Sequence, residues 1–353
     1  MLRSLAEIRT ERLRVDPNDL DSRESAAALR RGAEILRRGG TVAFPTETVY
    51  GLGANALDAC AVQRIFDAKQ RPSWDPLIVH VTTEDQLKSI VDQIPVKARM
   101  LMDAFWPGPL TLLLPKAAAL PGIVTAGRPR VGVRMPSHPV ARRLIDLAGL
   151  PIAAPSANSF GRTSPTRAEF VLADLDGRID AVIDAGSTSL GLESTVIDVC
   201  EEPPVLYRPG MVSYEQLQAV CGALTRYQAR PADAAAPSSQ PSPGTGLKHY
   251  APRARLILFE MARAAEMLDL ARKLQAEGEA VGLMLPEPWE GIPESGILLY
   301  RWGKWNDQYH LARRLFSGLR ELDAEGATVI LCPLPDGEGI GGAIRDRLLK
   351  AAL

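Results

Sequence analysis

Cationic side chains stand close to the ends of expected helices and strands in the first half of the sequence. Lys69 and Arg71 lie two residues apart at the end of an expected helix, and Arg134 alternates with apolar Val133 and Met135. Because side chains alternate along a strand, Arg134 faces away from these two neighbours and has to reach a surface or an anion. Arginine binds phosphate oxygens in a bidentate manner, and lysine offers a point charge. The pattern indicates a phosphate site, although Lys69 and Arg71 could also be solvated cations at a helix end.

The segment GTVAFPTETVYGLG at 40–53 joins a short apolar strand to a polar turn. Pro45 ends the expected strand because it lacks a backbone donor. Gly51 and Gly53 allow a sharp turn or a close approach of the backbone to a ligand. Open α/β sheets place ligands where strands end in such loops, whereas the simpler alternative is a turn with a buried tyrosine. The side chains that can hydrogen-bond here are Thr46, Glu47, Thr48 and Tyr50.

A hydroxyl-rich segment offers further small donors. The sequence PSAN at 155–158 follows an expected strand, and SFGRTSPT continues it at 159–166. These donors could bind phosphate oxygens, or the segment could be a surface turn that caps a helix near Ala168. Two more polar turns follow, GLESTVID at 191–198 and LYRPG at 206–210. With no Ser–His–Asp or Cys–His arrangement in the sequence, any catalysis here is expected to depend on positioning and charge stabilisation.

Periodicity and turn residues predict the elements that carry these side chains. In the first part of the chain, helices are expected over 21–38, 59–68 and 214–221. Strands are expected over 41–44, 77–81, 131–135, 151–155 and 182–184, and at the ends of 105–114 and 191–198. Strands and helices alternate again after residue 253, with strands over 256–259, 280–285 and 328–332 and helices over 261–277, 306–321 and 344–352. This alternation predicts a small parallel-sheet domain, in which GEGIGG at 337–342 is a helix-entry turn, since its spacing misses the known phosphate-binding motifs.

Composition bounds the possible functions. The 353 residues allow two domains, and a net charge of -1 gives no overall field that would attract nucleic acid. The first 20 residues carry acidic groups and no apolar stretch, which argues against a targeting peptide and favours a surface extension. No apolar run is long enough for a membrane span, so we expect a cytoplasmic protein. The cysteines are scattered singly, which favours reduced, buried thiols over a zinc site: Cys60, Cys200, Cys221 and Cys332.

A linker is expected between the two domains. Residues 229–246 are rich in Pro, Ala, Ser and Gly, and KHYAPR follows at 248–253. The aromatic Tyr250 beside two potential cations predicts that this segment closes over a ligand as a lid. The alternative is that these residues only dock the second domain.

The order of the motifs resembles that of the Sua5/YrdC family. PTETVYGLG, KQRP…PLIVHV, FWPGPLT, VRMP, PSAN, GLESTVID and RPG follow one another, and SPGTGLKHYAP with the second domain resembles the long, Sua5-type members. The resemblance implies an α/β fold: an N-terminal extension over 1–22, then a YrdC-like domain with a twisted mixed sheet over 23–213. A short helix and the linker or lid would occupy 214–252, and a smaller Rossmann-like Sua5 domain 253–353.

The resemblance also implies an activity. Family members are nucleotidyltransferases that make threonylcarbamoyl-AMP and pyrophosphate from L-threonine, bicarbonate or CO2, and ATP. The product serves the t6A37 modification of tRNAs that decode ANN codons, so hand-over to the tRNA threonylcarbamoyl transferase machinery is implied. Mg²⁺ is expected to arrive with ATP rather than in a protein-built site, and no tightly bound cofactor is expected.

The resemblance assigns site residues position by position. The threonine residues would be Thr48, His80, Arg130, Ala154 and Ser194. The ATP contacts would be Arg71, Asp75, Arg134, Ser156, Ser164, Arg208 and Tyr250, with Lys69, Arg71 and Arg134 as the catalytic cations. Three positions depart from the family pattern: Asp75 replaces the usual Asn, Arg130 the usual Thr and Phe160 the usual Ser.

Several alternatives stay open. His80 could hold threonine, assist proton transfer or be purely structural. The chain could instead be a non-catalytic RNA-binding maturation factor, which would need a basic face. It could also be a carbamoyl-handling domain related to hydrogenase maturation, but the cysteine sets expected there are missing.

Overall fold

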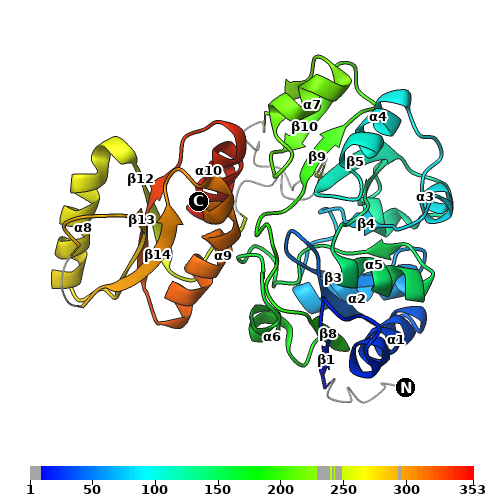
Figure 1. The fold of residues 1–353 in the computed structure, drawn as a ribbon, viewed down its shortest axis with the longest axis horizontal. Helices are drawn as coiled ribbons and strands as arrows, with labels where there is room; N and C mark the ends of the chain where they lie inside the picture. Colours follow the sequence, from blue (N-terminus) through cyan, green and yellow to red (C-terminus); the bar gives the residue numbers. More distant parts are fainter. Residues whose placement is uncertain (1–8, 229–238, 241, 243–248, 293–295) are drawn as a thin grey trace.

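Two α/β units follow one another along the chain (Figure 1) in the computed structural model, which describes residues 9–228, 239–240, 242, 249–292 and 296–353. Most of the expected lid, 229–248, therefore lies outside the described residues. The first unit is built on a mixed sheet with the strand order β1-β8-β2-β3-β7-β4-β6-β5-β9-β10-β11. Its strands are β1 (Glu11–Arg14), β2 (Val42–Pro45), β3 (Tyr50–Asn55), β4 (Ile78–His80), β5 (Leu110–Pro115), β6 (Arg130–Arg134), β7 (Ile152–Ala153), β8 (Ala181–Asp184), β9 (Thr195–Asp198), β10 (Val205–Arg208) and β11 (Thr225–Arg226).

Helices cover both faces of this sheet. They are α1 (Arg23–Arg37), α2 (Ala59–Lys69), α3 (Glu84–Ile90), α4 (Val96–Phe105), α5 (Pro139–Ala148), α6 (Ala168–Leu175) and α7 (Tyr214–Cys221), with a 3₁₀ turn at Gly122–Thr125. Strand β2 shows how the alternation fills the two layers: Val42 and Phe44 pack with α1 and α5, whereas Ala43 packs in the cluster of α2 and α4. The expected α/β fold with a mixed sheet is confirmed.

Helices α3, α4, α5 and α6 were not among the expected elements, and neither was β3, which occupies the glycine-containing part of the opening motif. It forms an antiparallel hairpin with β2, in which Val42 pairs with Gly53 and Phe44 with Gly51. A Cβ atom at Gly53 would lie 2.7 Å from the Phe44 ring and 2.8 Å from Ile152. The glycine thus permits close packing within a strand, where the sequence indicated a turn.

The expected N-terminal extension also contributes to the fold. Residues 11–14 form β1, which pairs in parallel with β8 at the edge of the sheet. Ser22 caps α1 as expected, because its side chain accepts a hydrogen bond from the Ser25 amide. The cysteines are free thiols; Cys221 and Cys332 are buried as expected, but Cys60 is exposed.

The second unit is a parallel sheet with the order β12-β15-β13-β14. Its elements are β12 (Arg255–Glu260), a 3₁₀ turn (Met261–Arg263), α8 (Ala264–Ala276), β13 (Val281–Glu287), β14 (Leu298–Lys304), α9 (Gln308–Ala324), β15 (Val329–Leu334) and α10 (Gly339–Ala351). The parallel sheet is confirmed, whereas β14 was not expected. The glycine-rich segment enters α10, which begins at Gly339 instead of residue 344.

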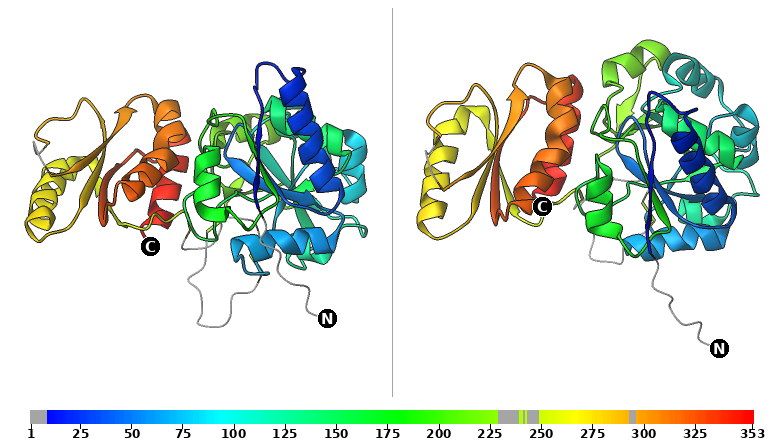
Figure 2. Two further views of the ribbon diagram at one scale, coloured as in Figure 1. Left: turned by 90° about the horizontal axis from the view of Figure 1, so that it is seen from below. Right: turned by 60° about the horizontal axis from the view of Figure 1, so that its bottom comes forward.

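Helices α9 and α10 lie between the second sheet and the first unit, and α8 covers the far face (Figures 1 and 2). Val49, Leu192 and Met211 of the first unit share a buried apolar cluster with α9 and α10. At Gly191 the two backbones approach so closely that a Cβ atom would lie 2.5 Å from the Arg313 Cα atom. The units are therefore joined by a packed apolar interface. Within the described parts of the chain, we find no helix with the length and apolar character needed to cross a bilayer.

Candidate active site

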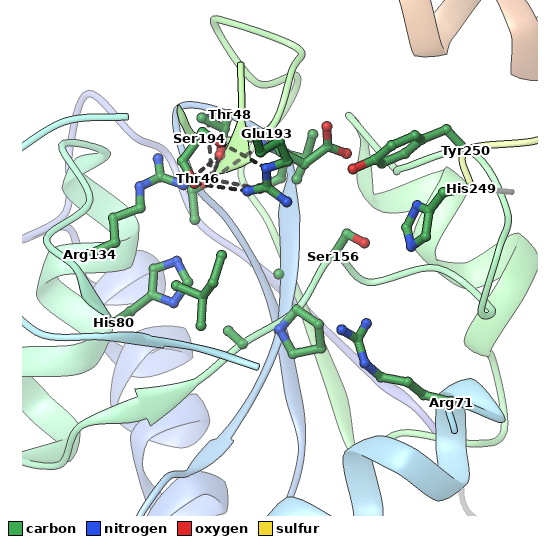
Figure 3. Close-up of a pocket in the computed structure, with 16 residues that line it drawn as sticks. Thr46, Thr48, Arg71, His80, Arg134, Ser156, Glu193, Ser194, His249 and Tyr250 are labelled. Atoms are coloured by element: carbon green, nitrogen blue, oxygen red, sulfur yellow. Dashed lines mark hydrogen bonds between the residues drawn. The ribbon is translucent and has the colours of Figure 1, made fainter. Parts of the chain in front are cut away.

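A pocket forms where the polar turns of the first unit meet residues 249–250 (Figure 3). Most of the residues assigned from the sequence line it: Thr48, Arg71, His80, Arg134, Ala154, Ser156, Ser194, Arg208 and Tyr250. They come from segments that are far apart in the sequence: most lie at the ends of strands or in the turns that follow, whereas Arg71 follows helix α2 and Tyr250 precedes β12. Figure 3 shows Arg134 and His80 toward one end, and Arg71, His249 and Tyr250 toward the other.

At one end, strand pairing places Arg134 beside His80. The two residues are partners in the parallel β4–β6 pair, so their side chains emerge on the same face. Arg134 Nη1 donates to Thr48 Oγ1 at 2.8 Å, and Nη2 lies 2.5 Å from Glu47 Oε1. Both charged side chains are almost fully buried, with exposed fractions of 4% and 6%. The buried arginine thus finds an anion, as the alternation in its strand predicted.

His80 is a neutral side chain in this environment. Burial and the neighbouring Arg134 lower its pKa to about 3, so the imidazole carries no charge at neutral pH. Its Nδ1 atom has no hydrogen-bond partner within the described residues. A base with such a low pKa binds a proton weakly, which favours a hydrogen-bonding role for His80 over proton abstraction.

Hydroxyl groups surround the same end of the pocket. Thr46 Oγ1 and Thr48 Oγ1 are 2.8 Å apart, and Ser194 Oγ is 2.7 Å from Thr111 Oγ1. Arg208 Nη2 donates to Ser194 Oγ at 3.1 Å. Together with Ala154, these groups make a small site with both apolar and hydroxyl-binding surfaces.

The other end is strongly cationic. Arg71 is buried and donates to the carbonyl oxygen of Pro76 at 2.7 Å, while its Nη2 atom lies 2.9 Å from Asp75 Oδ2. Burial, together with the charges of Arg71, Lys69 and Arg208, holds the pKa of His249 well below its usual range. The same positive charges that disfavour a protonated His249 would attract an anion. This end of the pocket therefore favours an anionic ligand.

Lys69 supports the pocket from behind. Its ammonium group donates to the carbonyl oxygens of Ser156, at 2.6 Å, and of Asn158. Burial and Arg71 lower the pKa of Lys69 well below its usual range. In this structure Lys69 fixes the PSAN turn, and it is not among the residues that line the pocket.

Three other assigned residues lie outside the pocket lining. Arg130 is directed toward Asp198, at 3.6 Å, and its side chain is 30% exposed. Ser164 donates to Glu193, and Asp75 pairs with Arg71. The departure at Phe160 places an aromatic ring between Trp74 and His249, with ring centroids 5.9 Å from each. The structure thus separates Arg130 from the predicted threonine residues.

The sequence did not point to two polar groups of the pocket, Glu193 and His249, as ligand-binding residues. Both lie inside motifs that were recognised in the sequence, GLESTVID and KHYAP. Membership in these motifs was the signal that could have identified them as pocket residues. Glu193 pairs with Arg347 of the second unit at 2.8 Å, and this contact has no local signature in the sequence.

Two family models match consecutive parts of the chain. One, described as "Telomere recombination", covers residues 34–210, and the other, described as "Threonylcarbamoyl-AMP synthase, C-terminal domain", covers residues 212–353. The Threonylcarbamoyl-AMP synthase of Pyrococcus abyssi is 43% identical over 92% of this chain and 94% of the relative. That of Bacillus subtilis is 42% identical over 98% of both chains.

A solved structure agrees with these matches. The crystal structure of P. abyssi Sua5 complexed with L-threonine superposes with a TM-score of 0.88 at 41% identity, covering 97% of this chain and 98% of that chain. Both domains and their order are thus shared with proteins of similar length. The chain belongs to the Sua5/YrdC family, among the two-domain members that carry the C-terminal domain of threonylcarbamoyl-AMP synthases.

Proposed function

We propose that this protein is a threonylcarbamoyl-AMP synthase, an ATP-using nucleotidyltransferase of the t6A pathway of tRNA modification. The observation that carries this function is the full-length similarity to synthases, together with a pocket that gathers the family motifs. The RNA-binding and carbamoyl-handling alternatives gain no support, because the relatives of matching length are named as synthases. The product would then pass to the tRNA threonylcarbamoyl transferase machinery.

The two ends of the pocket suit the two organic substrates. The P. abyssi relative binds L-threonine, and we assign threonine here to the end that holds Thr48, His80 and Ser194. Arg134 would neutralise its carboxylate, because the guanidinium lies at this end and not beside Arg71. Arg71 would face the phosphates of ATP together with Arg208, which donates to Ser194 where the two substrates would meet, and Lys69 would hold the PSAN turn.

The reaction then needs positioning more than a reactive side chain. The amine of threonine takes up CO2 and loses a proton, which gives a carbamate. A carbamate oxygen attacks the α-phosphorus atom of ATP, and the bond to pyrophosphate breaks. The cationic end would stabilise the charge that develops on the phosphate oxygens.

Mg²⁺ would enter with ATP. No group of three potential ligand side chains that could hold a metal occurs among the residues that the structure describes. The carboxylate that lines the pocket, Glu193, is already paired with Arg347. These residues fit a cation held mainly by phosphate oxygens, which supplies charge neutralisation at the leaving group.

One assay tests the function. Purified protein should release pyrophosphate from ATP only when both threonine and bicarbonate are present, and threonylcarbamoyl-AMP should accumulate. Release that does not depend on either substrate would contradict the proposal.

Amino-acid selectivity gives a second prediction. Serine should react more slowly than threonine by about 10- to 200-fold in kcat/KM, because a pocket discriminates on one methyl group by roughly 1–3 kcal/mol. Glycine should be worse, since it also lacks the hydroxyl group that the Ser194 end can receive. The bicarbonate-dependent release of pyrophosphate is measured for each amino acid. Equal rates for all three would exclude the threonine assignment.

Asp75→Asn should strengthen the binding of ATP. Burial raises the pKa of Asp75 despite the adjacent Arg71, yet the pair at 2.9 Å still occupies the guanidinium. A neutral amide at position 75 no longer pairs with the Arg71 guanidinium, whose positive charge can then act on the phosphates of ATP. The KM for ATP should therefore fall about fivefold, the equivalent of about 1 kcal/mol. Steady-state kinetics in ATP provide the measurement. A higher KM in a folded variant would mean that the Asp75 carboxylate itself serves the substrate.

A further inference from the structure

The second unit places a buried cation behind one residue of the pocket wall, Glu193. Arg347 lies on α10, and its side chain has no exposed surface. Its Nε atom donates to Glu193 Oε2 at 2.8 Å, and Nη2 donates to the carbonyl oxygen of Pro209 at 3.0 Å. Its third contact, from Nη1 to Asp346 Oδ2 at 2.7 Å, stays within the helix. Arg347 therefore reaches across the interface to two motifs of the first unit, GLESTVID and RPG.

The carboxylate that Arg347 holds belongs to the pocket. Glu193 lines it, and its other oxygen accepts a hydrogen bond from Ser164. Figure 3 shows the Glu193 carboxylate directed toward the end of the pocket that holds Tyr250. The Tyr250 ring also lies 5.2 Å from the Arg347 guanidinium carbon. A carboxylate with no cation beside it would repel phosphate oxygens at this position.

Other ion pairs between the units lack this connection. Arg167 and Glu321 pair at 2.7 Å with side chains 37% and 38% exposed, and Arg320 pairs with Asp174 at 2.8 Å. None of these four residues lines the pocket. The two units are thus held together by ion pairs that do not involve the pocket. Of these three pairs, Arg347–Glu193 is the one that includes a residue lining the pocket.

We infer that Arg347 is a positioning residue for the synthase reaction: it neutralises Glu193 and fixes its carboxylate, so that the pocket accepts the phosphates of ATP only when α10 is docked. This inference rests on the proposed function, and it gives the C-terminal domain a direct part in the binding of ATP. Arg347 itself acts through Glu193 and does not line the pocket.

The test is a charge rescue in the full-length protein. Arg347→Met removes the ion-pair partner of Glu193 and leaves the more distant Arg208 as the cation near its carboxylate, so KM for ATP should rise at least about tenfold, a change of about 1.4 kcal/mol. Adding Glu193→Gln removes the repelling charge and should restore most of that KM, even if the double variant melts at a lower temperature. Arg167→Met removes an ion pair between the units outside the pocket and should leave KM for ATP unchanged.

The outcomes separate this inference from the function on which it rests. If the wild-type protein releases no pyrophosphate with threonine and bicarbonate, the proposed function fails. If the wild type is active, an unchanged KM in folded Arg347→Met, or a double variant no better than the single one, overturns the positioning role. Should Arg347→Met not fold, Arg347→Lys keeps the charge and should keep the KM for ATP. A tenfold rise in Arg347→Lys would also overturn the inference.

Discussion

Replacing Arg134 with methionine should lower kcat/KM for threonine by about 10- to 200-fold, the equivalent of a hydrogen bond to a charged group worth about 1.5–3 kcal/mol. Arg134 is the cation that contacts Thr48 and pairs in the sheet with His80, so its loss removes the nearest counter-charge of the threonine carboxylate. The resemblance to the family assigned Arg134 to ATP, and the kinetics distinguish the two roles. A threonine contact raises KM for threonine, whereas an ATP contact raises KM for ATP.

The Arg134→Met substitution should also destabilise the protein, so the kinetic experiment needs a matched control variant. Arg134 and Glu47 form a buried ion pair, and removing one partner of such a pair costs about 3–5 kcal/mol. The double variant Arg134→Met with Glu47→Gln removes the remaining charge and should recover much of that stability, as read from Tm. Its activity should stay low. A folded double variant with wild-type kinetics would exclude Arg134 from substrate binding.

Local patterns in the sequence were sufficient for several single segments, although they missed helices α3, α4, α5 and α6. The position of Arg134 between Val133 and Met135 predicted that its side chain turns away from both, and the structure places it on the His80 face of the β4–β6 pair. Helix α7 begins and ends at the expected residues, because Ser213 and Gln216 form a capping box at its start.

Sequence patterns were insufficient where contacts between distant segments determine the local structure or the burial of a side chain. Gly51 and Gly53 suggested a turn, yet both lie within β3, where the side chains of Phe44 and Ile152 leave no room for a Cβ atom at Gly53. The assignment of Arg130 to threonine stays a prediction: its guanidinium lies 3.6 Å from Asp198, and the residue is not among those that line the pocket. Arg347 lies among other charged residues near the C-terminus, and only the docking of α10 shows that its side chain is buried against Glu193. Contacts between distant segments carry no local signature that a single sequence could reveal.

Tyr250 carries the second large expected effect, and its ring and hydroxyl group can be tested separately. The ring is buried against Phe316, with centroids 5.7 Å apart, and against His249, at 4.2 Å. The hydroxyl group has no hydrogen-bond partner within the described residues and belongs to a side chain that lines the pocket. Burial and Glu193 raise the pKa of Tyr250 to about 12, so at neutral pH the hydroxyl group is a donor that can reach a phosphate oxygen.

Tyr250→Phe should therefore raise KM for ATP by about 10- to 200-fold at an unchanged Tm, because it removes only a donor to a charged acceptor. Tyr250→Ala should cost about 3–5 kcal/mol of stability as well, since it leaves a cavity beside Phe316. If the linker closes as a lid, the Tyr250→Ala variant should also lose threonylcarbamoyl-AMP to hydrolysis, which is measured as excess AMP. In the wild-type protein, ATP with threonine should then slow proteolytic cleavage within 229–248. Wild-type kinetics in Tyr250→Phe, with ligand-independent proteolysis, would instead mean that Tyr250 only docks the second unit.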